Sequence, residues 1–210
     1  MATTLARGKK GGFLSELSEI AEENDATGAA VEFALPLEIQ KYPSAKLRDE
    51  NKKIGVFDAE LKKLADAMFA KMYESDGVGL AAPQVGVNYR LMVYNEAGER
   101  GKGAEVVMVN PKIVKFSKEK DMFEEGCLSF PAIYADVERP TAVTIEAQNV
   151  NGKKFKMTLD GFQARVFQHE YDHLDGVLFH DRMAADVVAK VRAELDDLIA
   201  AHPEGEPKAL

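Results

Sequence analysis

His169, Glu170 and His173 have the residue types and the spacing of a metal site. The two histidines are four residues apart, so on a helix both imidazoles lie on one face and can reach the same ion, with the glutamate beside them. This H-E-x-x-H pattern is typical of hydrolytic metal centres. The chain has only four histidines, so a chance match is rare. We therefore predict a metal-dependent hydrolase.

A catalytic ion of this kind usually takes three protein ligands and leaves one position open, so a third ligand is required. The metzincin extension of the motif is followed as far as Gly176, but Phe179 stands where its last histidine is needed, and His180 comes one residue late. We expect His180 to be a surface residue or to support the site from outside the ligand set. Glu194 would be a thermolysin-like ligand, but it lies on the polar side of an amphipathic segment, which favours a solvated position.

Cys127 is the better candidate for the third ligand. It is the only cysteine, so it cannot form a disulfide within the chain. A lone cysteine is most often a small buried apolar residue. Here, however, it stands in Glu124-Glu125-Gly126-Cys127-Leu128-Ser129, among polar groups at the expected end of a strand. Its thiolate would balance much of the charge of a divalent cation.

The charge and composition of the chain narrow the classes of function. Its 210 residues are enough for one domain with a sizeable core. A formal net charge of -8 argues against direct nucleic-acid binding, which depends on clustered Lys and Arg. No apolar run reaches the roughly 20 residues that cross a bilayer, so we expect no membrane insertion.

Apolar periodicity predicts the elements that position these residues. From 57 to 72 the apolar residues recur every three or four positions, which predicts a helix with one buried face. Short apolar runs predict strands at 91–94, 106–109 and 113–116. Alternation at 143–147 and 155–159 around Asn151-Gly152 predicts a β-hairpin.

The helix that carries the motif is predicted to begin at Asp160. This residue and Gln163 resemble a capping box, and Gly176 supplies a stop after His173. A final amphipathic helix is predicted from one apolar stripe, formed by Val187, Val188, Val191, Leu195, Leu198 and Ile199. The fold class is therefore α+β, with mostly antiparallel strands around a central metal-binding helix, one helix on the N-terminal side and an amphipathic helix at the C-terminus.

The composition also predicts three parts of the chain. Residues 1–35, with a basic start and an acidic continuation, form an N-terminal extension, which is either the remnant of a transit peptide or a solvated helical segment. Residues 36–202 form the catalytic domain, and residues 203–210 a short tail.

Residues 77–84 form another unusual segment. Their glycines and alanines allow a close approach of the backbone to a ligand, and Gln84 offers an amide donor. On its own the segment is equally compatible with an ordinary tight loop.

Three segments together resemble the signature motifs of the peptide deformylase family, in that family's order. They are Gly77-Val78-Gly79-Leu80-Ala81-Ala82-Pro83-Gln84, Glu125-Gly126-Cys127-Leu128-Ser129 and Gln168-His169-Glu170-Tyr171-Asp172-His173. The resemblance covers about residues 37 to 200. The terminal helix is similar to the type 1 form, and residues 38–43 and 127–131 are similar to the plant organellar 1B branch.

The resemblance implies removal of the formyl group from the N-terminal formylmethionine of new polypeptides, with release of formate. It implies that Cys127, His169 and His173 hold one divalent ion, with water as the fourth ligand. Fe(II) is the native ion of the family, often replaced by zinc or nickel. Glu170 would take a proton from the water and pass it to the leaving amine, work that is typically worth about 10² to 10⁴ in rate.

The resemblance also assigns residues around the substrate. The Gln84 amide and the Leu128 backbone N–H would stabilise the oxyanion. Gly79 matches a position whose backbone pairs with the extended peptide, and Tyr134 matches a position at the rim. The methionine pocket would be formed by Val78, Phe123, Phe162 and Val166, although apolar residues would look the same in any core.

Glu125 is also assigned to the substrate site. With Arg139 it forms either a supporting ion pair near the site or an exposed pair with no catalytic role. Two other functions stay open. A zinc-type peptidase or amidase could use the same helix, and an inactive deformylase-like protein could bind nascent chains. The inactive protein would be expected to lack Glu170 or Gln84, and both are present.

The implied partners are nascent N-formylmethionyl polypeptides near the ribosome. The organellar similarity predicts the chloroplast stroma, with the mitochondrial matrix and the bacterial cytoplasm as alternatives. The chain could act as a monomer or a homodimer.

Overall fold

The computed structural model of the chain describes residues 18–19 and 28–210, and the predictions for the rest of the N-terminal extension lie outside these described residues. The strands are β1 (Ser18–Glu19), β2 (Gly79–Ala81), β3 (Leu91–Tyr94), β4 (Val106–Phe116), β5 (Lys120–Cys127), β6 (Phe130–Pro140), β7 (Ala142–Gln148) and β8 (Lys154–Asp160). The α-helices are α1 (Ala59–Glu74), α2 (Gly161–Leu174), α3 (Ala185–Lys190) and α4 (Arg192–Ala201). Short 3-10 helices lie at Ala45–Leu47, Ala82–Val85 and Phe179–Arg182.

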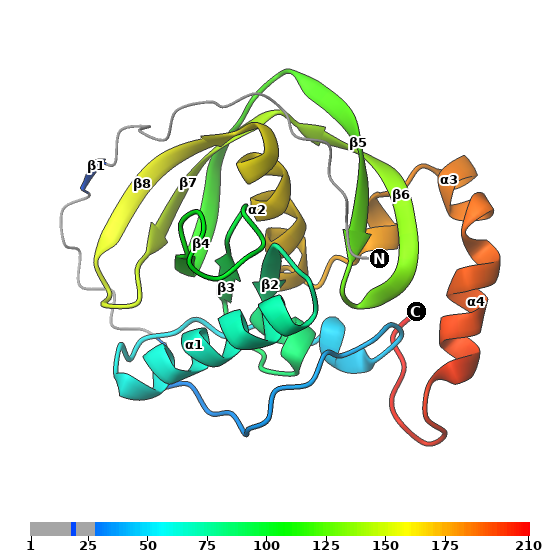
Figure 1. Cartoon of the computed structure of the whole chain (residues 1–210), viewed down its shortest axis with the longest axis horizontal. Helices are drawn as coiled ribbons and strands as arrows, with labels where there is room; N and C mark the ends of the chain where they lie inside the picture. Colours follow the sequence, from blue (N-terminus) through cyan, green and yellow to red (C-terminus); the bar gives the residue numbers. More distant parts are fainter. Residues whose placement is uncertain (1–17, 20–27) are drawn as a thin grey trace.

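The strands form two antiparallel sheets. One has six strands in the order β1-β8-β7-β4-β3-β2, and the other is the ribbon β5-β6. Helix α2 passes between them and packs against strands of both, while α1 lies along the β2-β3 end and α3 and α4 lie beyond β6 (Figure 1). The predicted α+β fold with a central helix is confirmed. Among the described residues, no helix is long and apolar enough to cross a membrane.

Helix α1 forms where apolar spacing predicted it. The Asp58 side chain caps it by accepting a hydrogen bond from the Leu61 N–H, at 3.0 Å. Its buried face carries Leu61, Leu64, Met68 and Met72, which pack under β2 and β3. The helix therefore supports the sheet edge that borders the site.

Two of the predicted strands form a single strand in the structure. Runs 106–109 and 113–116 form a single strand β4, and its pairing with β7 shifts register between Val109 and Lys112. Asn110 has a φ of 50°, and Pro111 has no N–H for the ladder, so the strand accommodates both in a bulge. The β7-β8 hairpin is confirmed, with Gly152 at a φ of 83° in the turn.

Helix α2 begins after Asp160 as predicted, but the prediction of a capping box is wrong. The Asp160 side chain makes no capping hydrogen bond, and it is exposed. Gly161 follows with a φ of 51°, and its N–H donates to the Thr141 carbonyl at 3.0 Å. The hairpin end, rather than a side chain, therefore fixes the start of the helix.

The predicted C-terminal helix is two helices. Val191, with a ψ of 12°, separates α3 from α4. No Gly or Pro stands there from which the break could be predicted. Three β-branched residues, Val187, Val188 and Val191, weaken the helix here because they lose side-chain freedom against the preceding turn. Glu194 is exposed, as expected.

Both ends of the described chain pack on the domain. Ala29 donates to the Lys53 carbonyl and accepts from the Gly55 N–H, and Val31 is buried in the core with α1. At the other end, the Ala45 N–H donates to the Pro207 carbonyl and the Ala209 N–H donates to the Pro43 carbonyl. Backbone hydrogen bonds therefore hold Ala29, Pro207 and Ala209, and burial in the core holds Val31.

Candidate metal centre and substrate pocket

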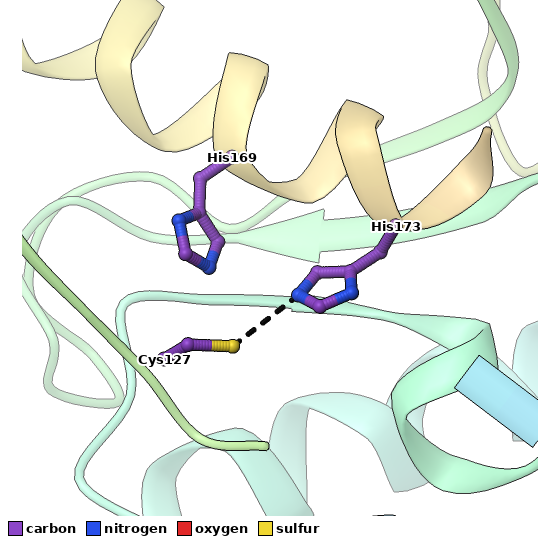
Figure 2. A group of neighbouring side chains, drawn as sticks. All are labelled: Cys127, His169 and His173. Atoms are coloured by element: carbon purple, nitrogen blue, oxygen red, sulfur yellow. Dashed lines mark hydrogen bonds between the residues drawn. The ribbon is translucent and has the colours of Figure 1, made fainter. Parts of the chain in front are cut away.

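Cys127, His169 and His173 converge in the structure. Cys127 ends β5, while both histidines project from α2, and their ligand atoms all lie within 4.8 Å of one another. The Cys127 Sγ is 3.3 Å from the His173 Nε2, and the two rings and the sulfur face a common space (Figure 2). All three side chains are buried. The α2 turn thus brings two imidazoles to the end of a strand.

The donor set fits a divalent cation. The Glu125 Oε2 is 2.9 Å from the His169 Nδ1, so Nδ1 carries the hydrogen and Nε2 is left free to ligate. Burial, with the charges of His169 and Arg139, lowers the pKa of His173 well below its usual value, which keeps its imidazole neutral. One thiolate and two imidazoles form a ligand set used for zinc and other transition metals.

His169 differs electrostatically from His173. Burial lowers the pKa of His169, but the Cys127 thiolate and the Glu125 carboxylate outweigh it and raise the pKa well above its usual value. Two negatively charged groups therefore lie next to this ring. A divalent cation bound there would compete with the second ring proton of His169.

Glu170 is buried beside the ligands. Its Oε2 has no hydrogen-bond partner, and burial raises the pKa of its carboxyl to about 7, against the opposing effects of His169 and of the Ala81 backbone. A carboxyl with a pKa near neutrality can both accept and return a proton. The arrangement therefore suits a general base that later acts as an acid.

Gln84, in the 3-10 helix after β2, and Leu128, in the turn after β5, both lie beside the same centre. The Gln84 Oε1 accepts a hydrogen bond from the Ala81 N–H at 2.7 Å, which turns its Nε2 toward the Cys127 Sγ, 3.6 Å away. Leu128 follows Cys127 directly in the turn between β5 and β6. Both residues line the pocket, so the side-chain amide of Gln84 and the backbone of Leu128 lie beside the candidate metal ligands.

A pocket of about 380 Å³ opens over the ligands. Of the residues predicted from the family resemblance, it is lined by Val78, Gly79, Gln84, Phe123, Glu125, Cys127, Leu128, Tyr134, Phe162, Val166, His169 and Glu170. His173 lies deeper, outside this lining. The pocket also includes residues that the sequence motifs give no role at the site: Ile39, Lys41, Asp76, Ile133 and Arg165. Ile39 and Lys41 belong to the segment that resembles the plant 1B branch, and the fold brings all five residues together.

The alternative that Glu125 and Arg139 form an exposed ion pair is wrong. Glu125 is 6% exposed and Arg139 4%, and the Arg139 Nε donates to the Glu125 Oε1 at 2.6 Å. Burial opposes ionisation of Glu125, but hydrogen bonds from His169 and Arg139 outweigh it and lower its pKa. Glu125 borders the pocket, yet its carboxylate faces His169 and Arg139.

His180 does not join the ligand cluster. Its ring packs edge-on against Tyr42 and at a tilt against Phe130, with centroids 4.8 and 5.4 Å away. Burial lowers its pKa below the usual value. It is partly buried in the core beneath α4 rather than at the surface.

Comparison with known proteins decides the family. Residues 36–188 match the model of the family described as polypeptide deformylase. The chain belongs to the peptide deformylase family. It is an enzyme that hydrolyses the N-formyl amide and so removes the formyl group from N-terminal methionine.

Plant deformylases are among the similar proteins. Peptide deformylase 1B, chloroplastic, of Oryza sativa subsp. japonica is 52% identical over 198 residues, which are 94% of this chain and 74% of the rice protein. Peptide deformylase 1B, chloroplastic/mitochondrial, of Arabidopsis thaliana is 52% identical over 186 residues, or 88% of this chain and 68% of that protein. A crystal structure of a plant peptide deformylase 1B superposes with a TM-score of 0.83 at 52% identity, covering 86% of this chain and all of the other.

Proposed function

We propose that Cys127, His169 and His173 hold the metal ion of this deformylase and that Glu170 moves the proton during hydrolysis. One observation carries the proposal: three ligand atoms lie within 4.8 Å of one another beside a buried carboxyl that has an unpartnered oxygen. When bound, the cation polarises the formyl carbonyl and lowers the pKa of a water molecule.

Glu170 has two tasks in succession. Its carboxylate accepts a proton as water attacks the formyl carbon, and its carboxyl then donates that proton to the amine of the departing methionine. The raised pKa of about 7 supports both transfers, because neither protonation state is strongly favoured near neutrality. Burial keeps bulk water away from this proton.

Gln84 and Leu128 stabilise the tetrahedral oxyanion. The Ala81 N–H holds the Gln84 oxygen, so the Gln84 Nε2 is oriented before substrate arrives. The Leu128 N–H would be the second donor. Such oriented donors cost no reorganisation during the reaction.

The substrate peptide would pair with β2, which is the last strand of the six-stranded sheet. An extended chain can add to an open edge through backbone hydrogen bonds, here at Gly79. The methionine side chain would enter the apolar wall formed by Val78, Phe123, Phe162 and Val166. Tyr134, 44% exposed, would contact the peptide at the rim.

We propose Fe(II) as the native ion, as the family resemblance implies, with Zn(II) or Ni(II) as replacements. One thiolate with two imidazoles accepts all three. The names of the rice and Arabidopsis relatives support an organellar location for this chain, and we propose the chloroplast stroma, close to ribosomes that release formylated chains. Elemental analysis of protein purified without oxygen tests the metal.

The activity is tested with two tripeptides. Formyl-Met-Ala-Ser should release formate, whereas acetyl-Met-Ala-Ser and an internal peptide bond should stay intact. Cleavage of the internal bond at a similar rate would favour the peptidase hypothesis instead.

A further inference from the structure

A network of ion pairs contacts His169 at its Nδ1. It joins three carboxylates to three guanidinium groups: Asp121, Glu125 and Asp172 with Arg139, Arg165 and Arg182. The signs balance, and the ring of His169 adds a hydrogen bond to Glu125. Four of these side chains are buried and paired with one another, while Asp121 and Arg182 reach the surface, so no buried ion is left unpaired.

Arg139 is the centre of this network. Its Nε and Nη2 donate to the two oxygens of Glu125 at 2.6 and 3.0 Å, and its Nη1 donates to the Asp172 Oδ2 at 2.7 Å. One rigid guanidinium therefore joins the carboxylate behind His169 to the residue that precedes His173. Arg139 reaches this place from β6, where it is 4% exposed.

Glu125 transmits this geometry to the ligand. Its Oε2 accepts from Arg139 Nη2 and lies 2.9 Å from the His169 Nδ1, so the position of the carboxylate sets the plane of the imidazole. Arg165 donates to the Glu125 Oε1 at 3.0 Å, but it is tied to Asp121 and not to Asp172. Only Arg139, among the described residues, contacts both Glu125 and Asp172.

We propose that Arg139 is a positioning residue that orients the ligand His169 through Glu125 and ties it to the turn of α2 that carries His173. This rests on the proposed ligand set. The residue type matters, because a planar guanidinium donates to two carboxylates in fixed directions, whereas a lysine ammonium is a single point charge on a flexible chain. Outer partners of ligating histidines tune metal affinity in this way.

The test compares Co(II)-substituted full-length proteins. Wild type, Arg139→Met, Arg139→Lys and Arg182→Met are loaded with Co(II), and affinity is measured by competition with a chelator, together with the visible absorption spectrum. Arg182→Met is the matched control, since Arg182 also binds Asp172 but is 48% exposed and does not reach Glu125. Far-UV circular dichroism and thermal unfolding of each variant establish that it is folded.

Both Arg139 variants should lose Co(II) affinity on the order of 10- to 100-fold and change the Co(II) spectrum, while Arg182→Met stays within a few-fold of wild type. A folded Arg139→Met with wild-type affinity and spectrum would overturn the proposal, and so would an equal loss in Arg182→Met. If Arg139→Met does not fold, Arg139→Lys decides by the same criteria. Formate release by wild type is measured separately, so a failure of the ligand or catalytic assignment is distinguishable.

Discussion

Gly79 and Glu170 are packed so closely that no side chain fits between them. A Cβ on Gly79 would lie 2.6 Å from the Glu170 Oε1 and 2.9 Å from the Val166 Cγ1. The strand that would pair with substrate therefore lies directly against the proposed proton carrier. Gly79 is required here for space, since its φ is not in the left-handed region.

Gly79→Ala should lower kcat strongly by displacing the Glu170 carboxyl. A misplacement of about 1 Å can cost on the order of 10²-fold in rate. Steady-state kinetics of the metal-loaded variant, with metal content measured on the same sample, gives the answer. Wild-type kcat would mean that the carboxyl moves without consequence.

Gln84→Ala should reduce kcat by about 10²- to 10³-fold, because one oxyanion donor is lost. Gln84→Glu keeps an oxygen for the Ala81 N–H but removes the NH₂ group, so it should be as impaired if donation is what matters. Kinetics of both variants with formyl-Met-Ala-Ser check this. Full activity in Gln84→Glu would remove Gln84 from the oxyanion site.

Phe123→Ala should raise KM for formylmethionyl peptides by opening the wall of the apolar pocket. Burying a methionine side chain against this wall is worth about 1.5–3 kcal/mol, so its loss should lower kcat/KM by roughly 10- to 100-fold. Met122→Ala is the control, because Met122 is the preceding residue of β5 and is 55% exposed. Equal effects in the two variants would argue against a methionine pocket at Phe123.

Val31→Ala should lower the free energy of unfolding by about 1–2 kcal/mol, because two buried methyl groups are lost from the core with α1. Leu35→Ala, in the same segment but 53% exposed, should have little effect. Urea unfolding measures both. No change in Val31→Ala would show that this side chain adds no stability to the domain proposed for 36–202.

Periodicity and motif spacing were enough to predict much of the fold. The period of three and four residues located α1, and the alternation around Asn151-Gly152 located the β7-β8 hairpin. The four-residue spacing of His169 and His173 predicted the convergence that the structure has. These features are local, so the sequence carries them directly.

The β6 strand and the β2 strand could not be predicted as easily. Ile133, Ala135 and Val137 alternate on the buried face of β6, but Arg139 continues that face, and a buried arginine is explained only by partners distant in sequence. The small residues of β2 gave no strand pattern, because its pairing with β3 and the close approach of Glu170 are tertiary effects. Contacts between residues distant in sequence therefore determine these two strands, and the local sequence pattern does not contain them.

Formate release by Glu170→Ala tests the central claim most directly. Wild type and variant are loaded with Fe(II) without oxygen, their metal contents are measured, and both are assayed with formyl-Met-Ala-Ser. With equal metal content, the variant should be slower by about 10² to 10⁴, the usual contribution of a general acid–base group. A metal-loaded Glu170→Ala that releases formate at the wild-type rate would contradict the assignment.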